Sequence, residues 1–357
     1  MGQHTRERPP RDEEGGAVSP PLFSDRLAHW MAVVRARRPL LRRLGLAFSL
    51  LIISVSAVIF IRTLLRIDPG KFGAAFAATR SDQIALAFAF TTLSYLALTG
   101  YDALALRHLK VHVPYRLTAL ASFTSYAASF TLGFPLVTGG AVRFWIYGPA
   151  GLSAGKVASL TVVAGVTFWL GMGLIVGVGL ICDAHAIGEL NHFSVLANSL
   201  IGYAAIGALS AYLVWTHYMR RRGKPILLNF SVPGPLLTLG QMALGVIDVC
   251  SAAATLYVLL PSGHGLGFLA FCALYSVAAM LGIASHAPGG LGVFEATMLD
   301  GVGGSSDQLL ASLLLFRGIY YVTPFVLALA LLGAYEAARR WRTLREAMAA
   351  SNAGDTE

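Results

Sequence analysis

The sequence has few charged residues and very little cysteine. Only 13% of its 357 residues are charged, whereas 56% are hydrophobic, which is the composition of a membrane protein rather than of a soluble domain. Its three cysteines lie in or beside apolar segments without the spacing of a zinc site. No Walker loop, nucleotide fingerprint, GxSxG or HExxH motif occurs. ATP hydrolysis by this chain is therefore disfavoured, and we expect no disulfide, metal, cofactor or bound nucleic acid.

Long apolar segments make up most of the chain instead. Several run for about 20 residues with at most one charge, the length that crosses a hydrocarbon core of ~30 Å as a helix. They predict an all-α polytopic membrane protein with a transmembrane domain at 44–336, a basic and partly disordered arm at 1–43 and a basic tail at 337–357. The apolar segments cover about residues 44–62, 84–106, 117–135, 156–181, 195–216, 234–260, 267–287 and 308–336.

The distribution of charge indicates that two of these segments do not cross. If all of them spanned, the basic loop at 220–224 would lie outside and the acidic loop at 183–189 inside, against the positive-inside rule. Both conflicts disappear if residues 117–150 and 267–303 are re-entrant hairpins. We therefore predict about six spanning helices and two hairpins, with both termini in the cytoplasm and no cleavable signal peptide ahead of the first apolar segment.

Each predicted hairpin contains residues that interrupt helices. Glycine and proline at membrane depth are tolerated where the backbone is buried in protein or lines a cavity. The same order of segments recurs in 44–181 and 195–336, which predicts an inverted repeat. Inverted repeats with broken helices near the membrane centre are typical of proteins that move a substrate across a bilayer. The predicted breakers are Gly133, Pro135, Gly139 and Gly140 in the first hairpin and Pro288, Gly289, Gly290 and Gly292 in the second.

Five charged residues lie well inside the predicted segments: Asp102, Arg143, Asp248, Glu295 and Arg317. Each is costly there, by roughly 2.5 to 3.5 kcal/mol on insertion scales, so each needs a partner or a function. Arg143 and Glu295 both follow a Gly-Gly pair. Either they form an internal salt bridge, or Arg143 binds a lipid phosphate through its two-pronged guanidinium and Glu295 balances a cationic headgroup or takes up a proton.

The other three charges also have two interpretations each. Asp102 could pair with Arg107 or with the histidine that follows it, or it could act in the same site. Arg317 could extend to the outer surface or face inward as a second phosphate ligand. Asp248 could form hydrogen bonds with Gln241 or a serine, or it could recognise a cation or a proton.

Three stretches of the sequence resemble a known family. TGYDALALRHL, GFPLVTGGAVRFWIYGPAGLSAGKVASLTVVAGVTFWLG and SHAPGGLGVFEATML occur in this order and are similar to the membrane region of the lysylphosphatidylglycerol flippase/synthetase family, over most of 84–335. In bifunctional members, a membrane flippase moves lysyl- or alanyl-phosphatidylglycerol to the outer leaflet, and a C-terminal cytosolic domain synthesises that lipid. The resemblance implies that the five intramembrane charges act in lipid translocation.

The resemblance covers the flippase region only, because the chain ends about 20 residues after its last apolar segment. We therefore expect no synthase activity. The resemblance implies a lipid translocator of the bacterial inner membrane that carries an aminoacylated or other anionic phospholipid. The alternative is a non-catalytic membrane subunit that presents lipid to a separate lipid-modifying transferase. The lipid, the direction and energy source of movement, and the formation of a homo-oligomer stay open.

Overall fold

The computed structural model describes residues 69–222, 233–261, 265–285, 287–303 and 306–354. Within these residues the chain forms helices and connecting loops, and no strand. The basic arm at 1–43 and the first predicted span at 44–62 lie outside the described residues. The all-α class that the composition predicts is confirmed for the rest.

Five helical segments are long and apolar enough to cross a membrane. They coincide with five of the six predicted spans, so the prediction of a polytopic membrane protein is confirmed. The last segment continues as one helix to Gly354, so most of the predicted tail is helical. The five segments are α4 (Ser81–His108), α7 (Ala154–Cys182), α9 (Val195–Arg222), α10 (Pro235–Tyr257), and the run of α13 (Ser306–Phe316), η2 (Arg317–Val322) and α14 (Thr323–Gly354).

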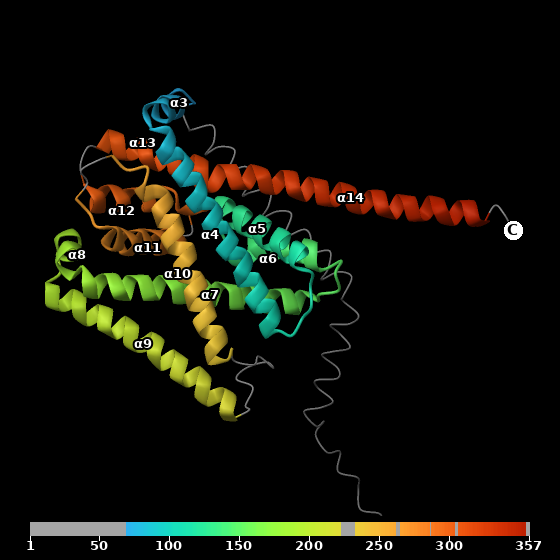
Figure 1. Cartoon of the computed structure of the whole chain (residues 1–357), viewed down its shortest axis with the longest axis horizontal. Helices are drawn as coiled ribbons and strands as arrows, with labels where there is room; N and C mark the ends of the chain where they lie inside the picture. The colour runs from blue at the N-terminus through green and yellow to red at the C-terminus, as the bar shows by residue number, and fades with distance from the viewer. Residues whose placement is uncertain (1–68, 223–232, 262–264, 286, 304–305, 355–357) are drawn as a thin grey trace, which may run out of the picture. The chain divides into compact units, whose positions relative to one another are not determined.

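Two helix–break–helix units occupy the positions of the predicted hairpins. In each unit the two helices pack against each other. Figure 1 shows α5 and α6 near the beginning of α7, and α11 and α12 near its end. Their re-entry into the membrane and the inverted repeat stay predictions. The units are α5 (Tyr115–Leu132) with α6 (Pro135–Tyr147), and α11 (Phe268–Ala284) with η1 (Pro288–Gly290) and α12 (Val293–Val302); α3 (Pro69–Ala78) and α8 (Ala184–Asn191) are short connecting helices.

The first break lies at the first two of its predicted breakers, Gly133 and Pro135. Gly133 and Phe134 have φ values of 79° and 52°, and Pro135 then begins α6. A proline at the first position suits a helix start, because its missing N–H would have no helical partner there. Gly139 and Gly140 lie inside α6, so the prediction that they break the helix is wrong. Gly139 instead lets α6 approach α5 closely, since a Cβ there would collide with the Ser129 hydroxyl at 2.6 Å.

The second break lies where it was predicted. Gly289, Gly290 and Gly292 have φ values of 60°, 67° and 85°, a region that residues with a Cβ rarely adopt. Gly290 also packs against the backbone of Gly282 in α11, where an added Cβ would lie 3.1 Å from the Gly282 Cα. Pro288 begins the single 3₁₀ turn within this break.

The core lies where α4, α7, α10, α11 and η2 meet. Helix α10 packs along both α4 and α7. It crosses α7 at Gly171 and Gly245, so closely that a Cβ on Gly171 would overlap the Gly245 backbone. Small residues at such a crossing are typical of membrane helices, because they let backbones approach one another. The fully buried rings of Tyr101, Phe271 and Phe316 fill the adjoining core.

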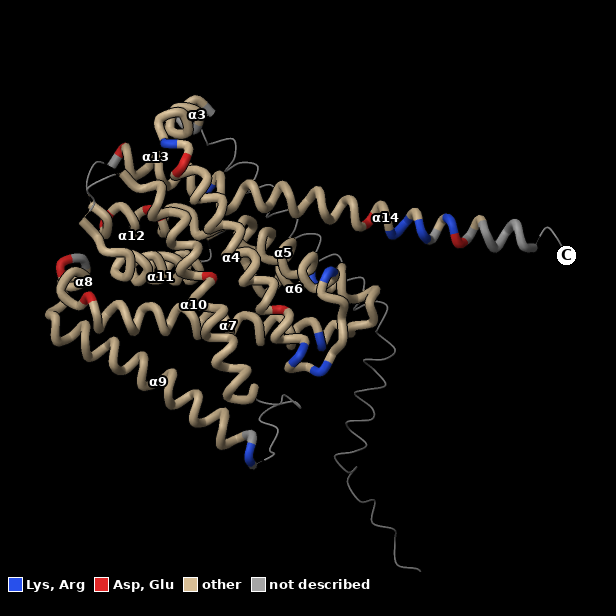
Figure 2. The backbone as a smooth tube through the Cα atoms, in the orientation of Figure 1, with Lys and Arg blue, Asp and Glu red and all other residues tan. Residues whose placement is uncertain are grey.

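Charged residues of the described part gather mainly toward the helix ends, as Figure 2 shows. Basic residues occur where α4 and α9 end and where α5 and α7 begin: Arg107, Lys110, Arg116, Lys156, Arg221 and Arg222. Acidic residues occur where α7 and α12 end, within α8 and where α13 begins: Asp183, Glu189, Asp300 and Asp307. This separation fits the predicted orientation, in which the basic end faces the cytoplasm.

Candidate functional site

Asp102 and Arg143 form a buried ion pair between α4 and α6. The Arg143 Nη2 donates to Asp102 Oδ1 at 2.8 Å, and Nε donates to Oδ2 at 3.0 Å. The hydroxyl of Tyr147 donates to the same carboxylate at 3.1 Å. The side chains of Asp102 and Arg143 are 0% and 3% exposed. The prediction that Asp102 pairs with Arg107 is wrong, because Arg107 lies on an exposed face of α4.

An aromatic ring covers the other side of this guanidinium. The Cζ of Arg143 lies 4.7 Å from the centre of the Tyr126 ring in α5. A guanidinium at this distance from a ring is attracted by the ring's electron-rich face. Arg143 is thus enclosed by a carboxylate from α4 and a ring from α5.

Glu295 and Arg317 form a second ion pair, at the second break. The Arg317 Nε donates to Glu295 Oε1 at 2.7 Å, and Nη1 donates to the carbonyl oxygen of Gly289 at 2.6 Å. The ring of Tyr321 lies 4.6 Å from the Arg317 Cζ. Arg317 therefore faces inward, and the prediction that it extends to the outer surface is wrong. A salt bridge between Arg143 and Glu295 is also wrong, since the described structure gives each of them another partner.

The backbone around the second pair is irregular on both sides. Arg317 begins a π-helical stretch, η2, and such stretches often mark functional sites. The backbone N–H of Gly292 donates to Glu295 Oε2 at 2.7 Å, which places the carboxylate at the N-terminus of α12. The helix dipole favours a negative charge there. Glu295 thus connects the start of α12 to the last membrane-crossing segment.

Asp248 lies in the core and accepts hydrogen bonds from two hydroxyl groups of α4. Ser94 donates to Oδ1 at 2.6 Å and Tyr101 donates to Oδ2 at 2.8 Å. The aspartate is 2% exposed. The predicted hydrogen bond with a serine is therefore confirmed, whereas the one with Gln241 is wrong, because its amide donates to Thr167 of α7.

Side-chain contacts connect all five intramembrane charges. Tyr101 packs edge-on against Tyr126, with ring centres 5.9 Å apart, and so links Asp248 to the Arg143 pair. Ser94 also lies 2.8 Å from the hydroxyl of Tyr320, which belongs to the same π-helical stretch as Arg317. The ring of Tyr320 contacts that of Tyr321, which lies beside Arg317. The structure thus connects the five predicted residues through hydrogen bonds and aromatic contacts.

The second break also contacts the end of α5, just before the first break. A Cβ on Gly289 would lie 3.2 Å from the carbonyl oxygen of Phe130, near the end of α5. Phe130 stacks on Tyr320 with ring centres 6.1 Å apart. The tip of the second hairpin therefore touches the end of the first helix of the other hairpin.

The sequence reasoning missed the hydroxyl groups that surround the charges. Ser94 and Tyr101 are seven residues apart, which places both on one face of α4. Polar groups that recur on one face of an apolar helix could have indicated that Ser94 and Tyr101 face the intramembrane charges. For Tyr126 and Tyr147 we see no such signal, because their role depends on how α5 and α6 pack.

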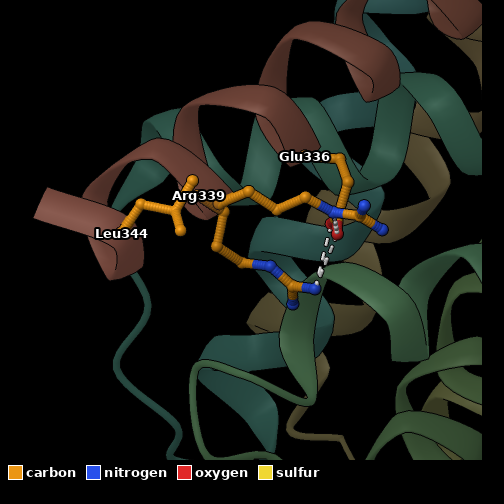
Figure 3. A pocket seen from close by; sticks show the side chains of 4 residues that line it. Glu336, Arg339 and Leu344 are labelled. Atoms are coloured by element: carbon orange, nitrogen blue, oxygen red, sulfur yellow. Dashed lines mark hydrogen bonds and ion pairs between the residues drawn. The ribbon is translucent and has the colours of Figure 1, made fainter. Parts of the chain in front are cut away.

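A surface pocket of about 630 Å³ lies apart from this region, on α14. Figure 3 shows the side chains that line it, with Leu344 further along the helix from Glu336 and dashed lines between the ion-pair partners. Arg339 and Arg340 both donate to Glu336 at 3.0 Å. None of the five intramembrane charges lines this pocket.

Known proteins resemble most of the chain. The model of the lysylphosphatidylglycerol synthase TM region matches residues 44–328. An uncharacterised protein of Synechocystis sp. is 34% identical over 277 residues, 76% of this chain and 85% of that protein. The inner membrane protein YbhN of Escherichia coli is 27% identical over 249 residues, 68% of this chain and 77% of its own.

A longer relative also matches, over about a third of its own length. The phosphatidylglycerol lysyltransferase of Staphylococcus aureus is 24% identical over 302 residues, which is 80% of this chain and 34% of that enzyme. The matched part is thus about a third of the enzyme. With the family model matching residues 44–328, the chain belongs to the family of the lysylphosphatidylglycerol synthase TM region and is a multi-pass membrane protein.

Proposed function

We propose that this protein moves an anionic phospholipid between the two leaflets of the bacterial inner membrane. The observation that carries the proposal is the pair of buried arginine–carboxylate contacts at two broken helices that touch each other. Family membership supports a lipid-related role, and the name of the Staphylococcus aureus relative refers to phosphatidylglycerol. Broken helices within a membrane supply polar groups where lipid cannot.

The two arginines are the proposed phosphate ligands. A guanidinium binds phosphate and carboxylate with the same planar fork, so a phosphate can replace the carboxylate partner without a change in the arginine's hydrogen-bond geometry. Arg317 and Glu295 have 11% and 20% exposed side chains, against almost none for the Arg143 pair. An entering headgroup would therefore meet Arg317 first.

The carboxylates fit a lipid that carries an amine as well as a phosphate. When phosphate takes over Arg317, the released Glu295 can balance the ammonium group of an aminoacylated headgroup. A simple anionic phospholipid would leave Glu295 charged and unpaired, which is costly at membrane depth. We thus favour an aminoacylated phospholipid, with its acyl chains remaining in the bilayer.

Lipid movement in proteoliposomes tests this proposal. Purified protein is reconstituted with labelled phosphatidylglycerol or its lysyl ester, and the headgroups that become accessible from outside are measured over time. The double variant Glu295→Gln, Arg317→Gln removes both charges of one pair and should lose the movement. Arg80→Gln, which removes an arginine from an exposed ion pair at the start of α4, is the matched control and should keep it. Equal movement by all three proteins would refute the proposal.

A second candidate function rests on the partial match to the lysyltransferase. In that relative, a region similar to this chain forms about a third of an enzyme. This chain could therefore have no transferase activity of its own and present lipid to a separate lipid-modifying transferase. The combination of bound phospholipid in the purified protein, no movement in proteoliposomes, and copurification with such an enzyme would favour this second function.

A further inference from the structure

Asp248 differs from the other four intramembrane charges because its hydrogen-bond partners are neutral. Asp102 is paired with Arg143 and Glu295 with Arg317. Among the described residues, Asp248 has hydrogen bonds only from Ser94 and Tyr101, and no ion pair. A lone charge in a low-dielectric interior is costly even with hydrogen bonds, so such a carboxylate gains from binding a proton.

We infer that Asp248 is a proton-binding site and that its proton controls how firmly Arg317 holds Glu295. The proton site stands on the contacts of Asp248 alone. Its coupling to lipid movement rests on the proposed function. The step is a single protonation: one proton adds to a carboxylate oxygen, the side-chain charge changes from −1 to 0, and no other covalent bond changes.

The hydrogen-bond network around Asp248 can accommodate both states. In the ionised state Ser94 must donate to Asp248, so the hydroxyl of Tyr320 donates to Ser94 at 2.8 Å. When Oδ1 carries the proton, it can donate to Ser94, whose own proton then turns toward Tyr320. The hydroxyl of Tyr320 thereby loses its acceptor. The network reverses without movement of the heavy atoms, and the change reaches Tyr320.

Tyr320 connects the reversed hydrogen bond at Ser94 to the ion pair of Glu295 and Arg317. It lies three residues after Arg317 in the π-helical stretch η2, and its carbonyl oxygen accepts from the Tyr95 hydroxyl at 3.3 Å. Its side chain is 3% exposed, and its ring stacks on Phe316 with ring centres 5.3 Å apart. After protonation the hydroxyl of Tyr320 accepts a hydrogen bond from Ser94, and its own proton has no acceptor among the described contacts. A buried donor without an acceptor is costly, which weakens the packing of η2 against α4. Protonation should therefore loosen η2 and favour release of Arg317 from Glu295.

The neighbouring ionisable groups are neutral near neutral pH. Phenol and thiol groups ordinarily lose their protons only at alkaline pH, so Asp248 is the group among them that changes its charge. The ion pair of Asp102 with Arg143 is separated from Asp248 by the rings of Tyr101 and Tyr126. The ionisable groups around Asp248 are Tyr95 and Tyr101 of α4, Cys250 of α10, Tyr126 of α5, Tyr275 of α11 and Tyr320 of η2.

Infrared difference spectroscopy tests the proton site without any transport assay. Spectra of the reconstituted protein at a series of pH values should show a protonated-carboxyl signal that titrates, and Asp248→Asn should lack it. Tyr101→Phe removes one hydrogen bond to the ionised form and should raise the midpoint of the titration by about one pH unit or more. A signal that persists in Asp248→Asn, or a midpoint unchanged in Tyr101→Phe, would overturn the inference. A signal displaced by sodium at constant pH would assign the site to a metal cation instead.

Lipid movement under an imposed pH gradient tests the coupling. In the wild type, movement should be faster when Asp248 is protonated, whereas Tyr320→Phe should keep the infrared signal and lose the pH dependence. Tyr203→Phe, which alters an exposed tyrosine of α9, is the matched control and should retain the dependence. Retained pH dependence in Tyr320→Phe would overturn the coupling. If the wild type moves no lipid but the infrared signal titrates, the proposed function fails and the proton site remains.

Discussion

The buried pair of Asp102 and Arg143 should dominate the stability of the first hairpin. Arg143→Gln would leave the Asp102 carboxylate fully buried, with the Tyr147 hydroxyl as its remaining partner among the described contacts. Removing one member of a buried ion pair destabilises proteins by about 3 to 5 kcal/mol, because an uncompensated charge stays inside. We expect this variant to unfold at a clearly lower temperature than the wild type.

Removal of both charges should restore most of that stability. Asp102→Asn combined with Arg143→Gln leaves two neutral amide side chains and no buried charge. Replacing a whole buried pair is often nearly neutral, so we expect the double variant to recover at least about 2 kcal/mol relative to Arg143→Gln. The double variant should stay somewhat less stable than the wild type, in part because it lacks the cation–π contact between Arg143 and Tyr126.

The assay is a double-mutant cycle. Thermal or denaturant unfolding of the four proteins, purified in one detergent, is followed by circular dichroism and by the loss of monodisperse protein. Arg80→Gln serves as the surface control, because its side chain is 78% exposed, and it should unfold like the wild type. Two outcomes would refute the reasoning: Arg143→Gln as stable as the wild type, or a double variant no more stable than the single one.

Three further predictions concern packing, orientation and the second pair. Gly171→Ala should lower stability by about 1 to 3 kcal/mol in unfolding experiments, because its Cβ would overlap α10, whereas Gly165→Ala has free space around it and should not. A cysteine at Arg221 should react with an impermeant thiol reagent only from the cytoplasmic side and one at Glu189 only from the outside; the opposite pattern would invert the predicted topology. Tyr321→Leu should lower the free energy of unfolding by about 0.5 to 2 kcal/mol, because it removes the ring beside Arg317; an unchanged free energy of unfolding would show that this contact contributes nothing to stability.

The spans and the approximate hairpins could be predicted from the sequence because they depend on local properties. The length of an apolar segment decides whether it can cross the membrane, and the positions of arginine and lysine indicate its orientation. The sequence could not show which of the predicted breakers in the first hairpin interrupt the helix. A glycine serves equally for a turn, as Gly133 does, or for close helix packing, as Gly139 does, and the sequence alone does not distinguish the two.

The pairing of the charges could be predicted only in part. Arg107 lies five residues after Asp102, and residues at that spacing are not neighbours on a helix surface, so helix geometry already argued against that pair. The partner of Asp102 is instead Arg143, on another helix. Its identity depends on the rotation of α4 and on how the first hairpin folds back. For Asp248, burial in the middle of a helix was foreseeable, but the identity of its donors depended on the packing of α4 against α10.

The unequal exposure of the two ion pairs indicates the order in which a lipid would engage them. Exchange of a carboxylate for a phosphate requires the headgroup to reach the guanidinium, and only Glu295 and Arg317 have appreciable exposure. Arg143 is closed off by its carboxylate and by Tyr126, which contacts Tyr101 and thereby the Asp248 network. Under the proposed function, the second hairpin would receive the headgroup first, and the first hairpin could bind it only after Tyr101 and Tyr126 have moved. Because Asp248 lies between the two pairs and is hydrogen-bonded to Tyr101, its protonation state is placed to influence that transfer.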